Sequence, residues 1–257
     1  MAVKSISAPS RLGTRRQPAV SRQAILKAAL AEFGEHGLSG ARMDAIAEAA
    51  GVNKALLYYY FRDKDALYGA VLDDFFVRMH ARIMQVFDST VSPGERLLQY
   101  VRAHFDSIAA SPYYARLFQR EMMSAGRLGS PHLSRIVERY IQPISQRVMD
   151  VLREGIESCE FRPVDVAQFA PSMVAAIVYY FVIAPVVRKL RNTDPFSAKA
   201  IQDRRAAVLD FVAAALFADR ESGVRMAAKI AAAESNSALL PQSAVHQRRR
   251  VPPRRVK

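Results

Sequence analysis

Residues 43–61, MDAIAEAAGVNKALLYYYF, decide the fold of the amino-terminal part of this chain. One short apolar helical pattern ends at Gly51, and another begins after Asn53. Glycine can adopt the left-handed backbone that a tight turn between helices requires, and asparagine is a favoured N-cap for the helix that follows. Two short helices joined in this way form a helix-turn-helix, whose second helix enters the major groove of DNA by its N-terminal residues.

The apolar spacing divides this stretch into an inward and an outward side. Ala47 is small where one helix would cross another closely, and Val52 would lie under the turn. Leu57 and Tyr60, three residues apart, would hold the second helix in place. The other side chains of that helix are then free to meet DNA.

The outward residues have the chemistry that DNA recognition uses. Lysine can reach a guanine edge or a phosphate, leucine can touch a thymine methyl group, and a tyrosine hydroxyl can donate to a phosphate oxygen. Lys64 would bind phosphate with support from the N-terminus of the next helix. The alternative is that Tyr58 and Tyr59 pack on the first helix of the motif instead. The predicted DNA-binding residues are Arg42, Asn53, Lys54, Ala55, Leu56, Tyr58, Tyr59, Tyr60 and Lys64.

These residues also carry a family resemblance. Over residues 21–70 the chain resembles the DNA-binding domain of the TetR/AcrR family of bacterial transcriptional regulators. The family pattern is met by Ile46, Ala47, Ala50, Gly51, Val52, Leu57, Tyr58, Tyr60, Phe61, Lys64 and Leu67. The family usually has threonine or serine at the start of the first motif helix, where this chain has Ala41 and Arg42. Arg42 could supply the phosphate contact there, and Ser39 or Asp44 could compensate for the weakened cap.

The remaining chain predicts an all-α protein. Helical patterns recur near 43–50, 53–60, 64–87, 93–110, 112–124, 132–158, 165–188 and 197–217, without a convincing run of strand-like alternation. Pro143 and Pro185 fall inside predicted helices and should kink or divide them. The predicted organisation is a disordered basic arm at 1–20, a helix-turn-helix DNA-binding domain at 21–66, a helical effector-binding and dimerisation domain at 67–221, and a disordered basic tail at 222–257.

The two ends of the chain carry most of its formal net charge of +13. Residues 1–23 contain five Lys or Arg and residues 235–257 contain six, and neither segment contains an acid. Such segments are attracted to polyanions, either nucleic acid or an acidic membrane surface. A lone cysteine and the absence of an apolar leader at the N-terminus suit the cytoplasm.

An uncharged stretch at 166–187 is long enough to cross a bilayer. A helix enclosed by its own protein or by a partner subunit has the same composition. The stretch and the basic ends therefore support an alternative, a membrane-associated helical protein, beside the DNA-binding interpretation. The prolines and polar residues within it favour burial in protein, and the expected protein is not bound to a membrane.

Reading a two-fold operator requires a dimer. The expected seam combines the 166–187 helix with an apolar stripe on the last predicted helix, formed by Ile201, Val208, Leu209, Val212 and Leu216. The family resemblance implies the same arrangement. With DNA bound by such a dimer, repression is favoured over activation, because the fold then needs only to block a promoter.

The family resemblance also implies a small-molecule pocket in the central helices. Aromatic and methionine side chains at helical spacing belong either to plain core or to a pocket for an apolar or aromatic effector, with polar anchors such as His104 or Glu121. The predicted pocket residues are Tyr100, His104, Phe105, Tyr114, Phe118, Glu121, Met122, Tyr140, Met173 and Tyr179. The sequence contains no phosphate-binding glycine loop, nucleophile motif or metal-ligand spacing, so neither an enzyme, a metal site nor a cofactor is expected.

Overall fold

The computed structural model describes residues 18–124 and 130–233. In chain order the helices are α1 (Pro18–Gly40), α2 (Met43–Ala50), α3 (Lys54–Tyr60), α4 (Lys64–Phe87), α5 (Pro93–Ala109), α6 (Pro112–Ser124), α7 (Pro131–Ile136), the π-helical turn η1 (Val137–Ile141), α8 (Gln142–Glu157), α9 (Val166–Val182), α10 (Ala184–Arg191), α11 (Ala198–Leu216) and α12 (Arg220–Ala232). Within the described ranges, extended pairing is limited to an isolated antiparallel bridge between Phe161 and Phe217. The all-α prediction is confirmed.

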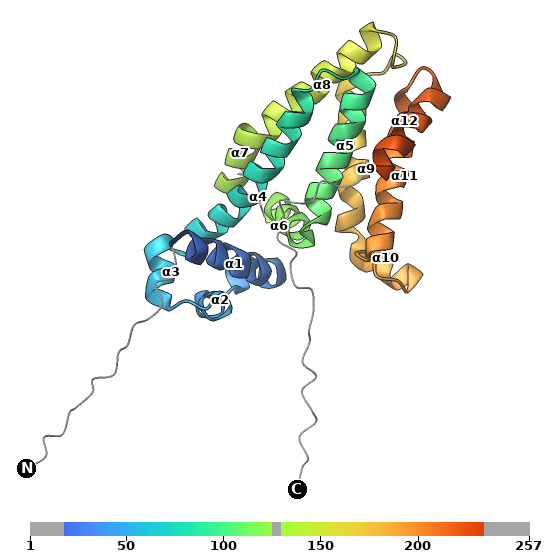
Figure 1. Ribbon diagram of the computed structural model, residues 1–257. Helices are drawn as coiled ribbons and strands as arrows, with labels where there is room; N and C mark the ends of the chain where they lie inside the picture. The colour runs from blue at the N-terminus through green and yellow to red at the C-terminus, as the bar shows by residue number, and fades with distance from the viewer. Residues whose placement is uncertain (1–17, 125–129, 234–257) are drawn as a thin grey trace, which may run out of the picture.

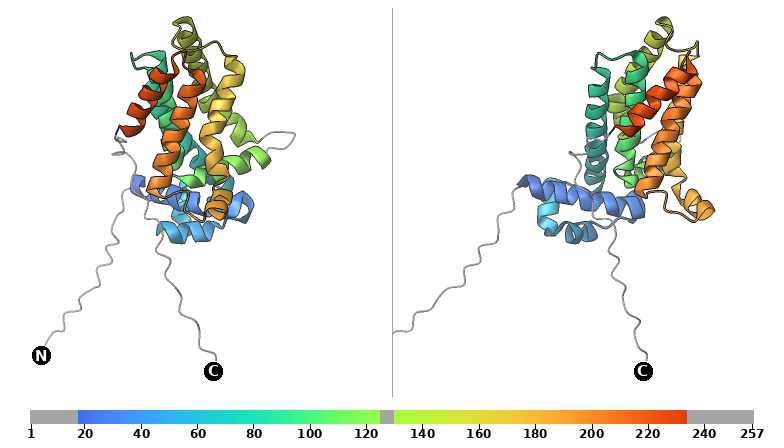
Figure 2. Two further views of the ribbon diagram at one scale, coloured as in Figure 1. Left: turned by 90° about the vertical axis from the view of Figure 1, so that its right-hand side faces the viewer. Right: turned by 45° about the vertical axis from the view of Figure 1, so that its right-hand side comes forward.

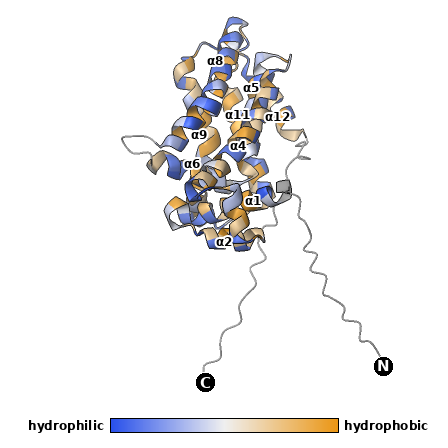
Figure 3. Cartoon of the chain, turned by 90° about the vertical axis from the view of Figure 1, so that its left-hand side faces the viewer, coloured by the Kyte–Doolittle hydropathy of each residue, from blue (hydrophilic) through white to orange (hydrophobic). Residues whose placement is uncertain are grey.

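The helices form a small unit and a larger body that share one long helix. Helices α1, α2 and α3 gather at one end of the molecule, and α4 runs from there into the larger body (Figure 1). Helices α9 and α11 lie side by side on one flank of that body, with α12 beyond α11 (Figure 2). In Figure 3 the helices carry both hydrophilic and hydrophobic residues along their length, as amphipathic helices do.

Prolines and capping side chains set several helix boundaries, as the sequence predicts. Ser92 accepts a hydrogen bond from the backbone of Glu95, and Pro93 begins α5. Pro185 lies in the first turn of α10 and divides the uncharged stretch into α9 and α10. Pro143 lies in the first turn of α8, directly after the π-helical turn, so it marks an irregularity in a continuous helical path.

The carboxyl-terminal boundary predicted at residue 222 is wrong. Asp219 caps a further helix, α12, which buries Gly223, Ala227 and Ile230 against the body. The Arg102 guanidinium on α5 donates to the carbonyl of Ile230 at 2.9 Å and to that of Ala233 at 2.6 Å. Small apolar residues at helical spacing form a packing face here. The basic residues predicted for the tail, and those of the arm up to residue 17, lie outside the described residues.

In residues 18–124 and 130–233, no single helix has both the length and the apolar composition needed to cross a membrane. Helices α9 and α10 meet that test only when they are taken together, and they are bent by 62° relative to each other.

Candidate nucleic-acid interface

The turn between α2 and α3 has the geometry that the sequence predicts. Gly51 has φ 65° and ψ 36°, the left-handed conformation that glycine adopts at low cost. Its amide donates to the Glu48 carbonyl at 3.0 Å, and the Val52 amide donates to the Ala47 carbonyl at 3.0 Å. These two bonds satisfy carbonyls at the end of α2 and fix the direction in which α3 begins.

Asn53 caps α3 as expected. Its side-chain Oδ1 accepts a hydrogen bond from the Leu56 amide at 2.7 Å. Helix α3 has only seven residues, so its stability depends on this cap and on the burial of Leu57, whose side chain is completely enclosed.

The start of α2 is held by Glu32 of α1, a residue that the sequence interpretation missed. Arg42 occupies the N-cap position on extended backbone and makes no side-chain cap. The Glu32 carboxylate on α1 instead accepts the Arg42 amide at 3.0 Å. The two residues expected to compensate make other contacts: the Ser39 carbonyl accepts a hydrogen bond from Lys64, and Asp44 pairs with Lys54 of α3. The acceptor at the start of α2 is therefore Glu32, ten residues before Arg42.

Helix α3 presents most of the predicted contact residues to solvent. Tyr59 is 81% exposed and Tyr58 is 43% exposed, whereas Leu56 and Tyr60 are half-buried. The rings of Tyr59 and Tyr60 meet edge to face at 5.4 Å between centroids. Tyr58 is therefore not enclosed by α2. Tyr60 packs inward, as its spacing predicts, and its ring also supports the exposed ring of Tyr59.

Lys54 forms an ion pair across the two helices of the motif. Its Nζ lies 2.8 Å from Oδ1 of Asp44, which is in the first turn of α2. Both side chains are more than half exposed, at 57% and 63%. The hydrogen bond from Lys54 lowers the pKa of Asp44, and the same bond raises the pKa of Lys54.

Lys64 is engaged with the backbone of its own protein. Its ammonium donates to the carbonyls of Ser39 at 3.0 Å and Ala41 at 3.2 Å, so it links the start of α4 to the connection between α1 and α2. An ammonium group has three donors, which leaves one for a phosphate oxygen. The phosphate contact stays a prediction, and the structural role is an addition to it.

The predicted effector residues divide into an enclosed group and two exposed ones. Tyr114 stacks on Phe75 of α4 at 4.2 Å between centroids, and Phe118 and Tyr140 contact the adjacent Phe76 at 5.5 Å and 6.0 Å. Tyr100, Phe105, Glu121 and Met173 are also buried, and His104 and Phe118 are half-buried.

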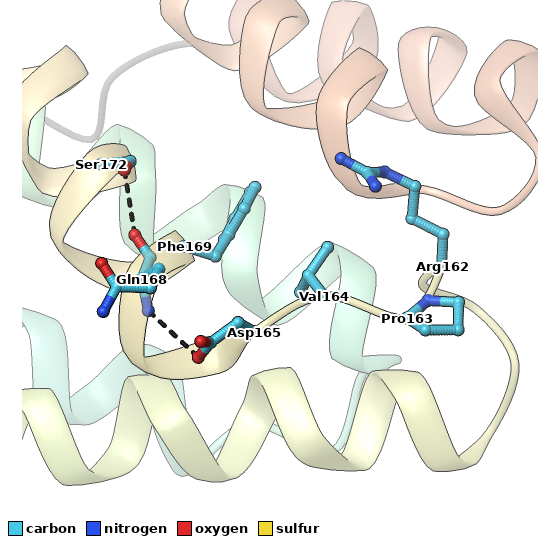
Figure 4. Close-up of a pocket in the computed structure, with 7 residues that line it drawn as sticks. All are labelled: Arg162, Pro163, Val164, Asp165, Gln168, Phe169 and Ser172. Atoms are coloured by element: carbon cyan, nitrogen blue, oxygen red, sulfur yellow. Dashed lines mark hydrogen bonds between the residues drawn. The ribbon is translucent and has the colours of Figure 1, made fainter.

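Two members of the predicted pocket do not face the interior. Met122 and Tyr179 are 47% and 60% exposed, because they lie on the outer sides of α6 and α9. A surface hollow of about 440 Å³ lies at the loop before α9 and shares no residue with the predicted pocket (Figure 4). Its lining is Arg162, Pro163, Val164, Asp165, Gln168, Phe169 and Ser172. The loop before α9 is at the end of the larger body remote from α3 (Figure 1).

Charged residues of α4 lie beside the enclosed aromatic group, and the sequence interpretation missed them. The Tyr114 hydroxyl donates to Asp74 at 3.4 Å, and Arg78 pairs with the same carboxylate at 2.6 Å. The Tyr140 hydroxyl donates to Asp73 at 3.5 Å. Their position on α4 could be predicted from sequence, but their approach to α6 and η1 depends on packing between distant segments.

The surroundings of His104 disfavour its charged form. Its Nδ1 lies 3.1 Å from the Tyr100 hydroxyl, and burial lowers the pKa of the imidazole to about 4. This neutral imidazole and the phenol beside it are the polar groups of the α5 part of the predicted pocket.

Helix α6 links the enclosed aromatic group to the small amino-terminal unit. Arg120 donates to the carbonyls of Phe33 and Glu35 near the end of α1, both at 3.2 Å. Next to it, the buried Glu121 carboxylate accepts the Tyr68 hydroxyl of α4 at 3.0 Å and the hydroxyl of Ser130, which caps α7. A shift of α6 would therefore act on α1 and α4 together.

The dimer stripe predicted on α11 is wrong for most of its residues. Val208, Leu209, Val212 and Leu216 are buried inside the single chain, and Ile201 is half-buried. They are enclosed because α11 packs on α5 and α12. The outer side of α11 instead carries Ala207 and Phe211, the latter 59% exposed.

Two family models match this chain, one for each part of the structure. Residues 25–71 match the model described as bacterial regulatory proteins of the tetR family. Residues 93–212 match the model of the tetracyclin repressor-like C-terminal domain. The first match contains the turn and α3, and the second runs from α5 to α11.

Individual relatives agree with these matches. The transcriptional repressor KstR2 of Mycobacterium tuberculosis is 32% identical over 194 residues, or 73% of this chain and 90% of that protein. The regulator RutR of Escherichia coli is 31% identical over 175 residues, or 67% of this chain and 80% of that protein. These relatives are regulators and not enzymes, and they give no support to the membrane-associated alternative.

Solved structures show the same fold. The ketosteroid transcriptional regulator KstR2 of Mycobacterium tuberculosis has a TM-score of 0.64 at 26% identity, covering 77% of this chain and 95% of that one. A gamma-butyrolactone receptor has a TM-score of 0.61 at 18% identity, covering 84% of this chain and 98% of that one. Together with the capped turn and exposed α3, these findings mean that the chain belongs to the TetR family of bacterial regulatory proteins and is a DNA-binding regulator of transcription.

Proposed function

We propose that this protein is a homodimeric repressor in the cytoplasm that binds a palindromic operator and leaves it when a small, largely apolar or aromatic effector binds. The observation that carries the proposal is α3 itself. It is capped by Asn53, fixed by Leu57, and presents Lys54, Tyr58 and Tyr59 to solvent. Repression is the function named for the KstR2 relative.

The outer sides of α9 and α11 supply a surface for the second copy. Pro171, Ala175 and Tyr179 recur every four residues along α9, and Ala207 and Phe211 do so along α11; all five are exposed. Helices α9 and α11 lie side by side (Figure 2). Two such pairs would make a four-helix interface with small residues at the crossing and aromatic rings at its edges.

The enclosed aromatic group between α4, α6 and η1 is the proposed effector region. Phe75, Phe76, Tyr114 and Tyr140 supply apolar aromatic surface, and Asp74 with Arg78 supplies polar groups beside them. A solved relative is named a ketosteroid regulator, and a ketosteroid is a largely apolar molecule. That relation supports an apolar effector class for this chain.

Release from DNA would proceed through α6. An effector that separates Tyr114 and Phe118 from α4 displaces α6, and α6 holds α1 through Arg120 and α4 through Glu121. The two copies of α3 would then lose the spacing of about 34–36 Å that successive major grooves require. The effector must bind the displaced state more tightly than the DNA-binding state for this to occur.

Selection of duplexes from a random library by the purified protein tests the operator and the dimer together. We expect an inverted repeat, bound by two chains per site and weakened steeply by salt. Enrichment of a single half-site by one chain would contradict the dimeric model. Apolar and aromatic compounds that raise the melting temperature should then lower affinity for the selected duplex, and compounds that stabilise the protein without affecting DNA binding would contradict the effector role.

A further inference from the structure

The ion pair between Asp44 and Lys54 lies where the reading of DNA takes place. Lys54 is the first residue of α3, and Asp44 is in the first turn of α2, so the 2.8 Å contact joins the N-terminal ends of both motif helices. The N-terminal residues of the second helix are those that reach base edges. Both side chains are exposed, so the pair is accessible to a DNA groove that receives α3.

A carboxylate at this position weakens the electrostatic attraction between the protein and DNA. Phosphate groups line both sides of the groove, and an exposed acid on the binding face repels them. Asp44 also neutralises the charge of Lys54, which reduces the contribution of that lysine to sequence-independent attraction. An exposed surface pair adds little to protein stability.

The geometry of the pair gives Lys54 a direction. An ammonium group has three donors, and one of them is occupied by Asp44. The remaining two match in number the O6 and N7 acceptors that guanine presents in the major groove. A lysine without this partner would sample many rotamers and would be drawn to the nearest phosphate, because its charge is then uncompensated.

We infer that Asp44 is a positioning residue for sequence recognition: it holds the Lys54 ammonium toward a guanine edge and keeps it from phosphates. This inference rests on the proposed function, because it assumes that α3 reads the major groove. Asp44 would then contribute to the choice of DNA sequence and not to the overall affinity for DNA.

The Asp44→Asn variant separates specificity from affinity. The measurement is the dissociation constant for the selected duplex and for a scrambled duplex of the same length, over a series of salt concentrations. We expect affinity for scrambled DNA to rise, its plot of log affinity against log salt to steepen by about 0.9 for one added phosphate contact, and the ratio of specific to scrambled affinity to fall roughly tenfold.

Asp150→Asn on α8 is the matched control, because it makes the same change of charge. Asp150 pairs with Arg153 at 2.9 Å, and both side chains are about half exposed, outside the small amino-terminal unit. The Asp150→Asn variant should leave the ratio of specific to scrambled affinity unchanged. Asp44→Glu keeps the carboxylate and should keep most of the wild-type ratio of specific to scrambled affinity. Melting curves test whether each variant is folded.

A double-mutant cycle decides whether Asp44 acts through Lys54. In a Lys54→Ala background, Asp44→Asn should no longer lower the ratio. An undiminished effect there would overturn the inference, because the carboxylate would then act on DNA by itself. Equal changes for both duplexes would overturn it as well. A wild-type protein that enriches no duplex would overturn the proposed function together with the inference, and it would do so before any variant is compared.

Discussion

At Gly155, the absence of a side chain lets α8 contact the ring of Phe161. A Cβ atom at this position would overlap that ring, and Phe161 is only 2% exposed, so the ring has little room to move. Gly155→Ala should therefore lower the free energy of unfolding by about 1–3 kcal/mol. Chemical denaturation measures this change. Gly40→Ala is the control, because its Cβ would meet His36 at an ordinary 3.4 Å, and an equal loss in both variants would contradict the explanation.

At His104, burial produces a dependence of stability on pH. The pKa is about 4 in the folded state against 6.5 for the free side chain, so the unfolded chain binds the proton first as the pH falls. This contribution to stability is complete above about pH 6.5 and is lost progressively down to pH 4, by at most about 3 kcal/mol. Denaturation of wild type and His104→Gln between pH 7.5 and 4.5 measures it; parallel curves would contradict it.

At the scale of elements, α3 is short enough that its cap controls its function. Asn53→Ala removes the acceptor of the Leu56 amide and should cost about 0.5–2 kcal/mol. Because the seven-residue helix must be formed to fit the groove, DNA affinity should fall in parallel with this loss.

Asn53→Ser separates the cap from a direct DNA contact. Serine also caps helices well, so this variant should keep nearly full affinity for the selected duplex in a gel-shift titration. Loss of affinity in Asn53→Ser with unchanged melting would indicate that the amide itself touches DNA.

At the scale of the whole molecule, the proposed dimer depends on the outer side of α9 and α11. A glutamate in place of Phe211, which is 59% exposed in the single chain, would bury a charge in the proposed interface. Phe211→Glu should give monomers in analytical ultracentrifugation and lower operator affinity at least about tenfold.

Val77→Glu serves as its control, since Val77 is an exposed apolar residue of α4, at 46%. Helix α4 lies away from the flank formed by α9 and α11 (Figure 1). A dimer that survives Phe211→Glu, or one that is lost equally in Val77→Glu, would contradict the proposed seam.

The sequence by itself determined the turn at Gly51, the cap at Asn53, the outward side of α3 and the bounds of α2 and α4. These features depend on residues within a few positions of each other, so local propensity and spacing specify them.

Only the tertiary structure decided which partner each apolar or charged side chain meets. A helical period shows that Val208 and Val212 share a side of α11, but the packing of α5 and α12 decides that this side is core and that Phe211 faces outward. Likewise, the partners of Arg42 and Lys64 lie ten or more residues away. Local spacing does not specify such contacts, because they form only when separate helices pack together.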